Sequence, residues 1–418
     1  MSEHAINETK TAVKLFRAFA MWLCIAGVIG LAGGLAGALF HTGVELATDF
    51  RGTHPWLLWL LPIGGLVIAA LYKLTKMETT NTNAIIDSIH FGDNVPLRLV
   101  PVILIGTVIT HLCGGSAGRE GAALQIGGGL GCNIGRLFRL GEKDMRLATL
   151  CGMSAVFSAL FGTPLTATLF ALEVISVGLL YYSGLVPCMA ASLAAYGITR
   201  LFGIAPTRFV LASPPLGADL LWRVAVLAIV CAVVSSVFCI VMHAAERLAA
   251  KKLPNVFVRI VLGGVAVIAL TYLVGTTDYN GAGMSVIRTA IEGGTARPFA
   301  FFWKLIFTVV TLSCGFKGGE VVPTFCIGAT LGCVVGQLLG IPPGFAAAIG
   351  LVAVFCGAVN CPIASIMLSI ELFGSGALIY FAVACIISYM LSGYFGLYSS
   401  QRIMYSKSTA EFINISAR

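Results

Sequence analysis

Charged residues are scarce in this sequence. Of its 418 residues, 11% are charged and 58% are hydrophobic, a balance that excludes a soluble domain. A chain this apolar over its whole length needs many membrane segments, each of about 20 mostly apolar residues. The net charge of +8 does not indicate nucleic-acid binding, because the basic residues are scattered in short segments between apolar runs. Such an excess of Lys and Arg marks the cytoplasmic side.

Motifs for metals, disulfides and nucleotides are also missing. The 13 cysteines form no C-x-x-C pair, and the six histidines form no H-E-x-x-H motif. We therefore expect neither a metal site nor a cofactor. The chain has no P-loop, and no serine or aspartate pair at catalytic spacing, so we do not expect an enzyme.

Glycine, in contrast, is abundant, and the stretch 114–122 combines it with charge. Arg119 and Glu120 lie there between apolar runs. An ionisable pair at bilayer depth usually faces a cavity or an ion path, which also disfavours a purely structural scaffold. The glycines leave N–H groups free to face an anion at the start of the next helix, near Ala122. This pattern predicts an anion site with a titratable glutamate. The alternative is a bend in which the two charges only neutralise each other.

The chain also repeats itself. Residues 118–122 match 319–323, and 163–173 match 361–371, where a proline and a glutamate share one offset. Short, interrupted segments in corresponding halves are typical of inverted-repeat transporters with a site at the midplane. We take the paired glutamates Glu173 and Glu371, each after an apolar run, as structural. The expected organisation is a cytoplasmic tail (1–11), a first membrane repeat (12–206), a linker (207–217), a second membrane repeat (218–400) and a cytoplasmic C-terminal segment (401–418), without a regulatory domain of the CBS type.

Four loops carry a family resemblance: 79–84, 114–122, 315–323 and 396–399. Together they resemble those of the CLC family of anion channels and anion/proton antiporters, over nearly the whole chain. The resemblance implies an all-α polytopic membrane protein, an inverted repeat of two halves with many tilted and broken helices. It also implies a homodimer with one anion pathway per subunit.

The resemblance assigns roles to individual residues. It makes Glu120 the gating and proton-coupling group, whose carboxylate occupies an anion site when ionised and leaves it when protonated. Positive helix N-termini around a carboxylate give a physical basis for this behaviour. The residues that the resemblance places at the anion are Asn81, Arg119, Gly121, Val321, Val322 and Tyr398.

Departures from the family pattern bear on the substrate. Where the family's first loop reads G-S-G-I-P, this chain reads Thr80-Asn81-Thr82-Asn83-Ala84, so an amide replaces a serine hydroxyl. Glu173 is followed by Val174, not by the second glutamate of many chloride/proton members. Both differences resemble the fluoride/proton antiporter branch. Asn81 is alternatively only a helix N-cap, and Asn83 or Thr82 faces the anion in another register.

The expected function is therefore a fluoride/proton antiporter that exports fluoride in exchange for protons. Fluoride is a strong hydrogen-bond acceptor, and amide and backbone donors compensate the loss of its hydration. Its partners are fluoride, protons and membrane lipid, and not nucleic acid. We expect a bacterial inner membrane location, multi-pass, with both termini cytoplasmic. The alternatives are a chloride/proton exchanger and a passive anion channel of the same fold. Glu320 receives no role.

Overall fold

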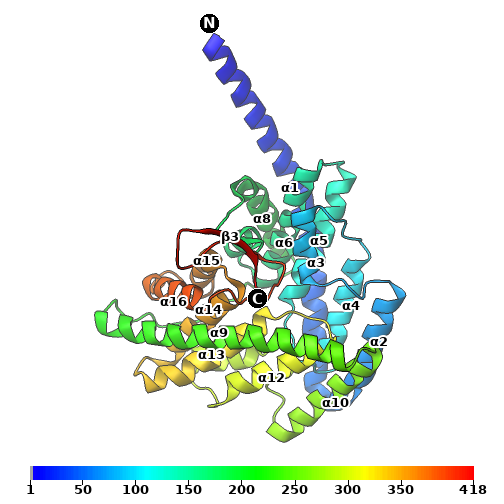
Figure 1. Ribbon diagram of the computed structural model, residues 1–418, viewed down its shortest axis with the longest axis vertical. Helices are drawn as coiled ribbons and strands as arrows, with labels where there is room; N and C mark the ends of the chain where they lie inside the picture. The colour runs from blue at the N-terminus through cyan, green and yellow to red at the C-terminus, as the bar shows by residue number, and fades with distance from the viewer. Residues whose placement is uncertain (1–2) are drawn as a thin grey trace.

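The computed structural model describes residues 3–418, and side chains from residue 11 onward, and it is mostly helical (Figure 1). The first half contains α1 (Glu3–Thr53), η1 (Pro55–Leu60), α2 (Leu61–Leu74), α3 (Thr82–Phe91), α4 (Leu99–Leu112), α5 (Glu120–Leu137), α6 (Glu142–Phe161), α7 (Pro164–Glu173), η2 (Tyr182–Gly184) and α8 (Leu185–Leu201). The second half contains α9 (Ala218–Lys252), α10 (Val256–Val274), α11 (Met284–Glu292), α12 (Ala300–Ser313), α13 (Val321–Leu338), α14 (Pro343–Val359), α15 (Pro362–Phe373) and α16 (Leu378–Leu391).

The helices of the two halves correspond in order, and those on either side of the glycine-rich loops also correspond in length. Helices α4 and α12 both have 14 residues, and α5 and α13 both have 18. The helix after each glycine-rich loop therefore begins at the equivalent residue, Glu120 in one half and Val321 in the other. This agrees with the alignment predicted from the sequence and with an inverted repeat of many short, broken helices.

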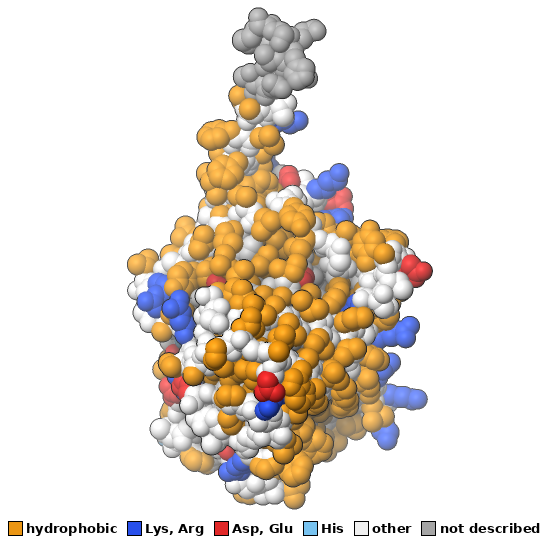
Figure 2. Space-filling model, turned by 90° about the vertical axis from the view of Figure 1, so that its left-hand side faces the viewer, with side chains coloured by type: hydrophobic (Ala, Val, Ile, Leu, Met, Phe, Trp, Pro, Cys, Tyr) orange, Lys and Arg blue, Asp and Glu red, His pale blue; other side chains and the backbone are white. Residues whose placement is uncertain are grey.

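The surface and the helix lengths fit a membrane. Among the described residues, seven helices are long and apolar enough to span a bilayer, and five further apolar helices are shorter. Figure 2 shows hydrophobic side chains covering much of the face in view. The loops before α5 and α13 are hydrogen-bonded to each other and contain buried residues such as Ser116 and Phe316, so their polar backbone lies inside the protein rather than in lipid.

Glycine permits the closest helix contacts. A Cβ on Gly127 of α5 would collide with the backbone carbonyl of Gly152 of α6. The same collision would occur between Gly328 of α13 and Gly350 of α14. These backbones touch because neither partner has a side chain, which is the usual way in which helices pack tightly in lipid. Both helices that carry the glycine-rich loops are thereby fixed against a neighbour.

The paired glutamates at the ends of α7 and α15 link the two halves. The Glu173 carboxylate accepts hydrogen bonds from the N–H groups of Ile363 and Ala364 in the first turn of α15, at 3.1 and 2.8 Å. Glu371 accepts two from the first turn of α7, also at 3.1 and 2.8 Å. Each glutamate caps a helix N-terminus of the other half. These bonds are consistent with the structural reading of both residues.

A small sheet departs from the expectation of an all-helical chain. Strands β1 (Ser176–Val177), β2 (Arg402–Tyr405) and β3 (Phe412–Ser416) form one sheet in that order, with β1 parallel to β2 and β2 antiparallel to β3. Helix α7 ends at Glu173, and the chain enters β1 three residues later. The C-terminal segment contributes a hairpin because its apolar residues alternate in β3, a strand pattern that we had not used.

Candidate anion and proton site

The two glycine-rich loops meet at the centre of the site. Gly118 and Gly319 form a pair of backbone hydrogen bonds, with N···O distances of 2.7 and 2.8 Å. The N-termini of α5 and α13 therefore lie side by side. A third N-terminus, that of α3, joins them, since the Thr82 hydroxyl donates to the carbonyl of Gly121 at 3.4 Å. Free N–H groups in the first turns, each end equivalent to about half a positive charge, make this junction attractive to an anion.

Glu120 lies at this junction and is fully buried. Its Oε2 accepts a hydrogen bond from the backbone N–H of Arg119 at 2.9 Å, whereas Oε1 has no hydrogen-bond partner among the described residues. The carboxylate folds back over Gly118, where a Cβ would lie 2.7 Å from Oε2. Only glycine leaves that space. The carboxylate is thus hydrogen-bonded at one oxygen and not at the other, which is unusual for a buried carboxylate.

Arg119 is only weakly paired with Glu120. The Nε of Arg119 is 3.6 Å from Glu120 Oε1. Its Nη1 contacts His41 Nδ1 of α1 at 2.8 Å, and its Nη2 donates to the carbonyl of Leu160 of α6 at 3.4 Å. The guanidinium is therefore tied to two other helices. Mutual neutralisation of the two charges does not account for this geometry.

Two cavities adjoin the junction. The first, which we call the Glu120 cavity, has a volume of about 310 Å³ and is lined by His41, Val44, Glu45, Thr48, Asp49, Arg51, His111, Arg119, Glu120, Phe161, Thr207, Asn280, Ala282, Gly283, Met284, Ser285 and Val322. The second, the Tyr398 cavity, has about 150 Å³ and is lined by Thr80, Asn81, Thr82, Asn83, Ile103, Gln125, Met242, Glu246, Leu312, Gly315, Phe316, Lys317, Gly318, Glu320, Leu397 and Tyr398. Residues of the paired loops line both.

The Tyr398 cavity contains several polar atoms without partners. The phenol oxygen of Tyr398 is buried and makes no hydrogen bond with the described residues, and the same holds for Gln125 Oε1 and Glu320 Oε2. Buried polar groups are normally paired, so unpaired ones that converge on a cavity point to a missing ligand or water. A cavity of this size holds a small ion with a few waters.

The asparagines of the first loop have different contacts. Asn81 Oδ1 accepts from the N–H of Ala84 at 3.0 Å and so caps α3, and Asn81 also lines the Tyr398 cavity. Because capping uses only the amide oxygen, both amide N–H donors remain for another acceptor. Asn83 Oδ1 instead accepts from the N–H of Ser400 at 3.2 Å, just beyond Tyr398. Asn81 therefore caps the helix and faces the cavity at once, and Asn83 supports the tyrosine loop.

The sequence-predicted residues lie together around the junction. Asn81, Thr82, Asn83 and Tyr398 line one cavity, and Arg119, Glu120 and Val322 line the other. Gly121 and Val321 are buried in the first turns of α5 and α13.

Sequence reasoning missed Lys317 and Glu320, which line the Tyr398 cavity. A charged pair in a glycine-rich loop, the signal that identified Arg119 and Glu120, was also present there.

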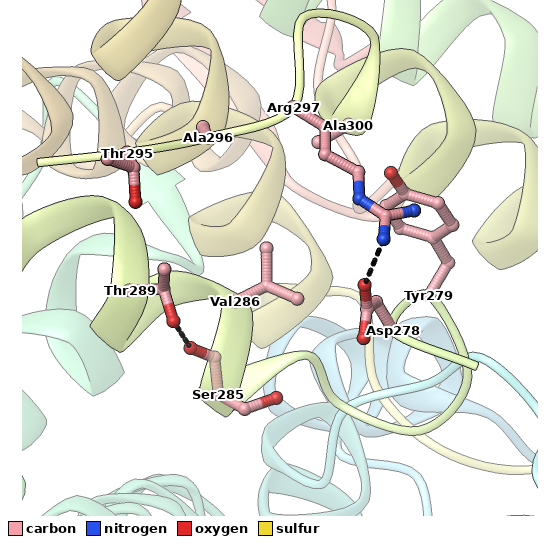
Figure 3. A pocket seen from close by; sticks show the side chains of 9 residues that line it. All are labelled: Asp278, Tyr279, Ser285, Val286, Thr289, Thr295, Ala296, Arg297 and Ala300. Carbon is pink, nitrogen blue, oxygen red and sulfur yellow. Dashed lines mark hydrogen bonds and ion pairs between the residues drawn. The ribbon is translucent and has the colours of Figure 1, made fainter. Parts of the chain in front are cut away.

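A third cavity lies next to the Glu120 cavity and shares Ser285 with it (Figure 3). It has a volume of about 420 Å³, and an ion pair between Asp278 and Arg297 crosses it at 3.8 Å. It contains none of the predicted site residues, and its only charged side chains neutralise each other.

Comparison with known proteins identifies the family. A family model described as voltage gated chloride channel matches residues 64–393, well over half of the chain. The chain belongs to this family, the CLC family. It is therefore a multi-helix membrane transport protein with the CLC inverted repeat. A CLC relative from Pseudomonas syringae pv. tomato, named chloride/fluoride channel protein, is 40% identical over 397 residues, which cover 93% of this chain and 88% of that protein.

Further CLC proteins match over most of their length. A crystal structure of a CLC-type fluoride/proton antiporter is 31% identical, with a TM-score of 0.89 over 91% of this chain and 98% of that one. A chloride/proton exchange transporter, ClcA of Salmonella arizonae, is 26% identical over 422 residues, covering 90% of this chain and 87% of that protein. A slow cyanobacterial chloride/proton antiporter, 20% identical with a TM-score of 0.78 over 89% of this chain and 94% of that one, shares the fold.

Proposed function

We propose that this protein exports fluoride in exchange for protons, and that Glu120 is the group that couples the two. The observation that carries the proposal is the position of its carboxylate, which is fully buried at converging helix N-termini and has one oxygen without a hydrogen bond from the described residues. An ionised carboxylate there takes the place of an anion. A protonated one loses its attraction to the helix N-termini and yields that place. Proton uptake and anion occupancy then alternate.

The anion contacts in this proposal come from both sides of the junction. Near Glu120, the backbone N–H groups of the first helical turns and the guanidinium of Arg119 surround the path. In the Tyr398 cavity, the Asn81 amide and the Tyr398 phenol supply donors. The residues assigned to the anion are Asn81, Arg119, Gly121, Val321, Val322 and Tyr398, with Asn83 and Thr82 as neighbours of Asn81.

Two features favour fluoride over chloride. The amide of Asn81 presents two N–H donors, and fluoride, which is small and strongly hydrated, requires good donors in exchange for its water. Val174, fully buried after Glu173, leaves that helix end without a second titratable group. The names of two relatives, one a chloride/fluoride channel protein and one a fluoride/proton antiporter, support the same substrate.

The remaining assignments are parts of the same proposal. We place the protein as a homodimer in a bacterial inner membrane, with one pathway per subunit and both termini in the cytoplasm. The corresponding helices of the two halves support repeats at 12–206 and 218–400 with a linker at 207–217.

Transport measurements in liposomes test the proposal. Purified protein is reconstituted into vesicles loaded with fluoride or with chloride, and anion efflux and external pH are recorded together. We expect fluoride efflux accompanied by proton uptake, with much slower chloride efflux. Chloride/proton exchange, the activity named for the Salmonella relative, is the second candidate, and comparable chloride and fluoride rates would favour it. Anion efflux without proton movement would make the protein a passive channel.

A further inference from the structure

Lys317 lies at the Tyr398 cavity, and no carboxylate of the described residues forms a close ion pair with it. Its backbone N–H, in the loop between α12 and α13, donates to the Thr110 hydroxyl at 3.2 Å. Its Nζ lies 4.1 Å from the ring centre of Tyr72, on α2. Among the side chains that the structure describes, the ammonium group makes no hydrogen bond and no ion pair, although the Glu246 carboxylate, which lines the same cavity, attracts it from a longer distance. The Lys317 side chain is partly buried and lines the cavity.

A second buried lysine, Lys304, has the hydrogen bonds expected of a structural residue. Lys304 of α12 is fully buried, and its Nζ donates to Ser116 Oγ at 2.9 Å and to the carbonyl oxygens of Tyr279 and Gly281 at 3.1 and 2.6 Å. All three donors of its ammonium group are used. Lys317 uses none of its three donors in a hydrogen bond, although placing an ammonium group at this depth is costly.

We propose that Lys317 is an anion-capture residue, whose ammonium group draws a small hard anion, fluoride, into the Tyr398 cavity and toward Asn81. A compact ammonium group is a strong hydrogen-bond donor as well as a point charge, which suits a small anion. The cavity of about 150 Å³ limits the ligand to a single ion with a few waters. The contact with the Tyr72 ring keeps the ammonium group in place without neutralising it.

Other charges near the cavity modulate this capture. Glu246 of α9 and Glu320 line the same cavity, and Arg259 of α10 also acts electrostatically on Lys317. Glu246 is half exposed and 3.9 Å from His243. Because an anion and an ionised Glu320 repel each other in so small a space, capture is strongest when Glu320 carries a proton.

The inference rests on the proposed function, and kinetics separate the two. We would measure the initial rate of fluoride efflux against luminal fluoride concentration for the full-length wild type, Lys317→Met and Lys317→Arg. Lys317→Met is expected to raise KM about tenfold and to change kcat less than about twofold, because attraction between the ammonium group and the anion in the cavity acts mainly on binding. Lys317→Arg is expected to have a KM close to that of the wild type, because arginine keeps the positive charge.

Lys73→Met is the matched control. Lys73 also lies over an aromatic ring, with its Nζ 5.3 Å from the centre of the Phe257 ring, but it lines neither cavity. Its KM is expected to equal that of the wild type. An unchanged KM in Lys317→Met, or a rise of the same size in Lys73→Met, would overturn the inference while leaving fluoride transport intact.

Two further results keep the test decisive. If Lys317→Met does not fold, Lys317→Gln gives the same comparison. In the wild type, raising the luminal ionic strength with an impermeant salt should raise KM, since salt screens the ammonium group; a KM independent of salt would also contradict the inference. A wild type that moves no fluoride would instead refute the proposed function.

Discussion

Four glutamates of the matched segments in the two halves lie at or near helix termini, yet they form two different pairs. Glu173 and Glu371 each fill both carboxylate oxygens with N–H groups of the opposite half. Glu120 Oε1 and Glu320 Oε2 accept no hydrogen bond from the described residues, and each of the two glutamates lines a cavity. The residue type and the attraction to helix N-termini are shared. What distinguishes a structural carboxylate from one available for transport is whether its hydrogen-bonding capacity is already used.

The largest effect is expected from Glu120→Gln. An amide cannot titrate, so proton movement should fall by about 100-fold or more, the usual contribution of a positioned proton-transfer group, while anion flux continues. Simultaneous recording of fluoride efflux and pH in liposomes measures both. Glu371→Gln is the control, since it removes a titratable group that is already fully hydrogen-bonded. Proton transport that survives in Glu120→Gln would remove Glu120 from the mechanism.

Glu320→Gln should show a smaller loss of coupling. If the unpaired oxygen of Glu320 exchanges protons with the Tyr398 cavity, its loss should lower proton flux about tenfold, at the weak end of proton-transfer effects, and leave fluoride efflux less affected. The ratio of the two fluxes is the measurement. An unchanged ratio would place Glu320 with the structural pair.

Glu173→Ala should act on stability. The substitution leaves two N–H groups at the start of α15 without acceptors and should destabilise the protein by about 2 kcal/mol. Thermal unfolding in detergent reports this loss. The surviving folded protein should keep its fluoride/proton ratio, and a changed ratio would show that Glu173 also takes part in transport.

The smallest effect is expected from Asn81→Ser. Serine can still cap α3, but it offers one donor to the cavity where the amide offers two. Losing one hydrogen bond is worth about 0.5–1.5 kcal/mol, so the preference for fluoride over chloride should fall about two- to tenfold. Efflux rates for the two anions give the ratio. If the ratio stays the same, Asn81 serves α3 alone.

Much of this arrangement was predictable from the sequence. The repeat could be predicted from the matched loops, because glycine, proline and glutamate occur at corresponding positions in both halves. It correctly paired Glu120 with Val321 as the first residues of α5 and α13. The structural reading of Glu173 and Glu371 followed from their place after apolar runs, although their partners in the opposite half could not be seen.

Other features depended on tertiary structure. The register of the first loop is set by which asparagine caps α3 and which one reaches Ser400, and both residues fit either role in sequence. The availability of Lys317 depends on a cavity built from three loops and from α3, α4, α5, α9 and α12, and on the Tyr72 ring of α2. The C-terminal hairpin forms because β1 supplies an edge to pair with, a long-range condition that local propensity does not contain.

The hydrogen-bonded pair of Gly118 and Gly319 has a mechanical consequence. Each loop continues into a helix that is fixed against its neighbour by backbone contact, α5 against α6 and α13 against α14. A shift of either loop is therefore passed across the pair and not absorbed beside it. Two segments far apart in the chain act as one joint, so that a displacement on the Glu120 side reaches the Tyr398 side while the surrounding helices stay where they are.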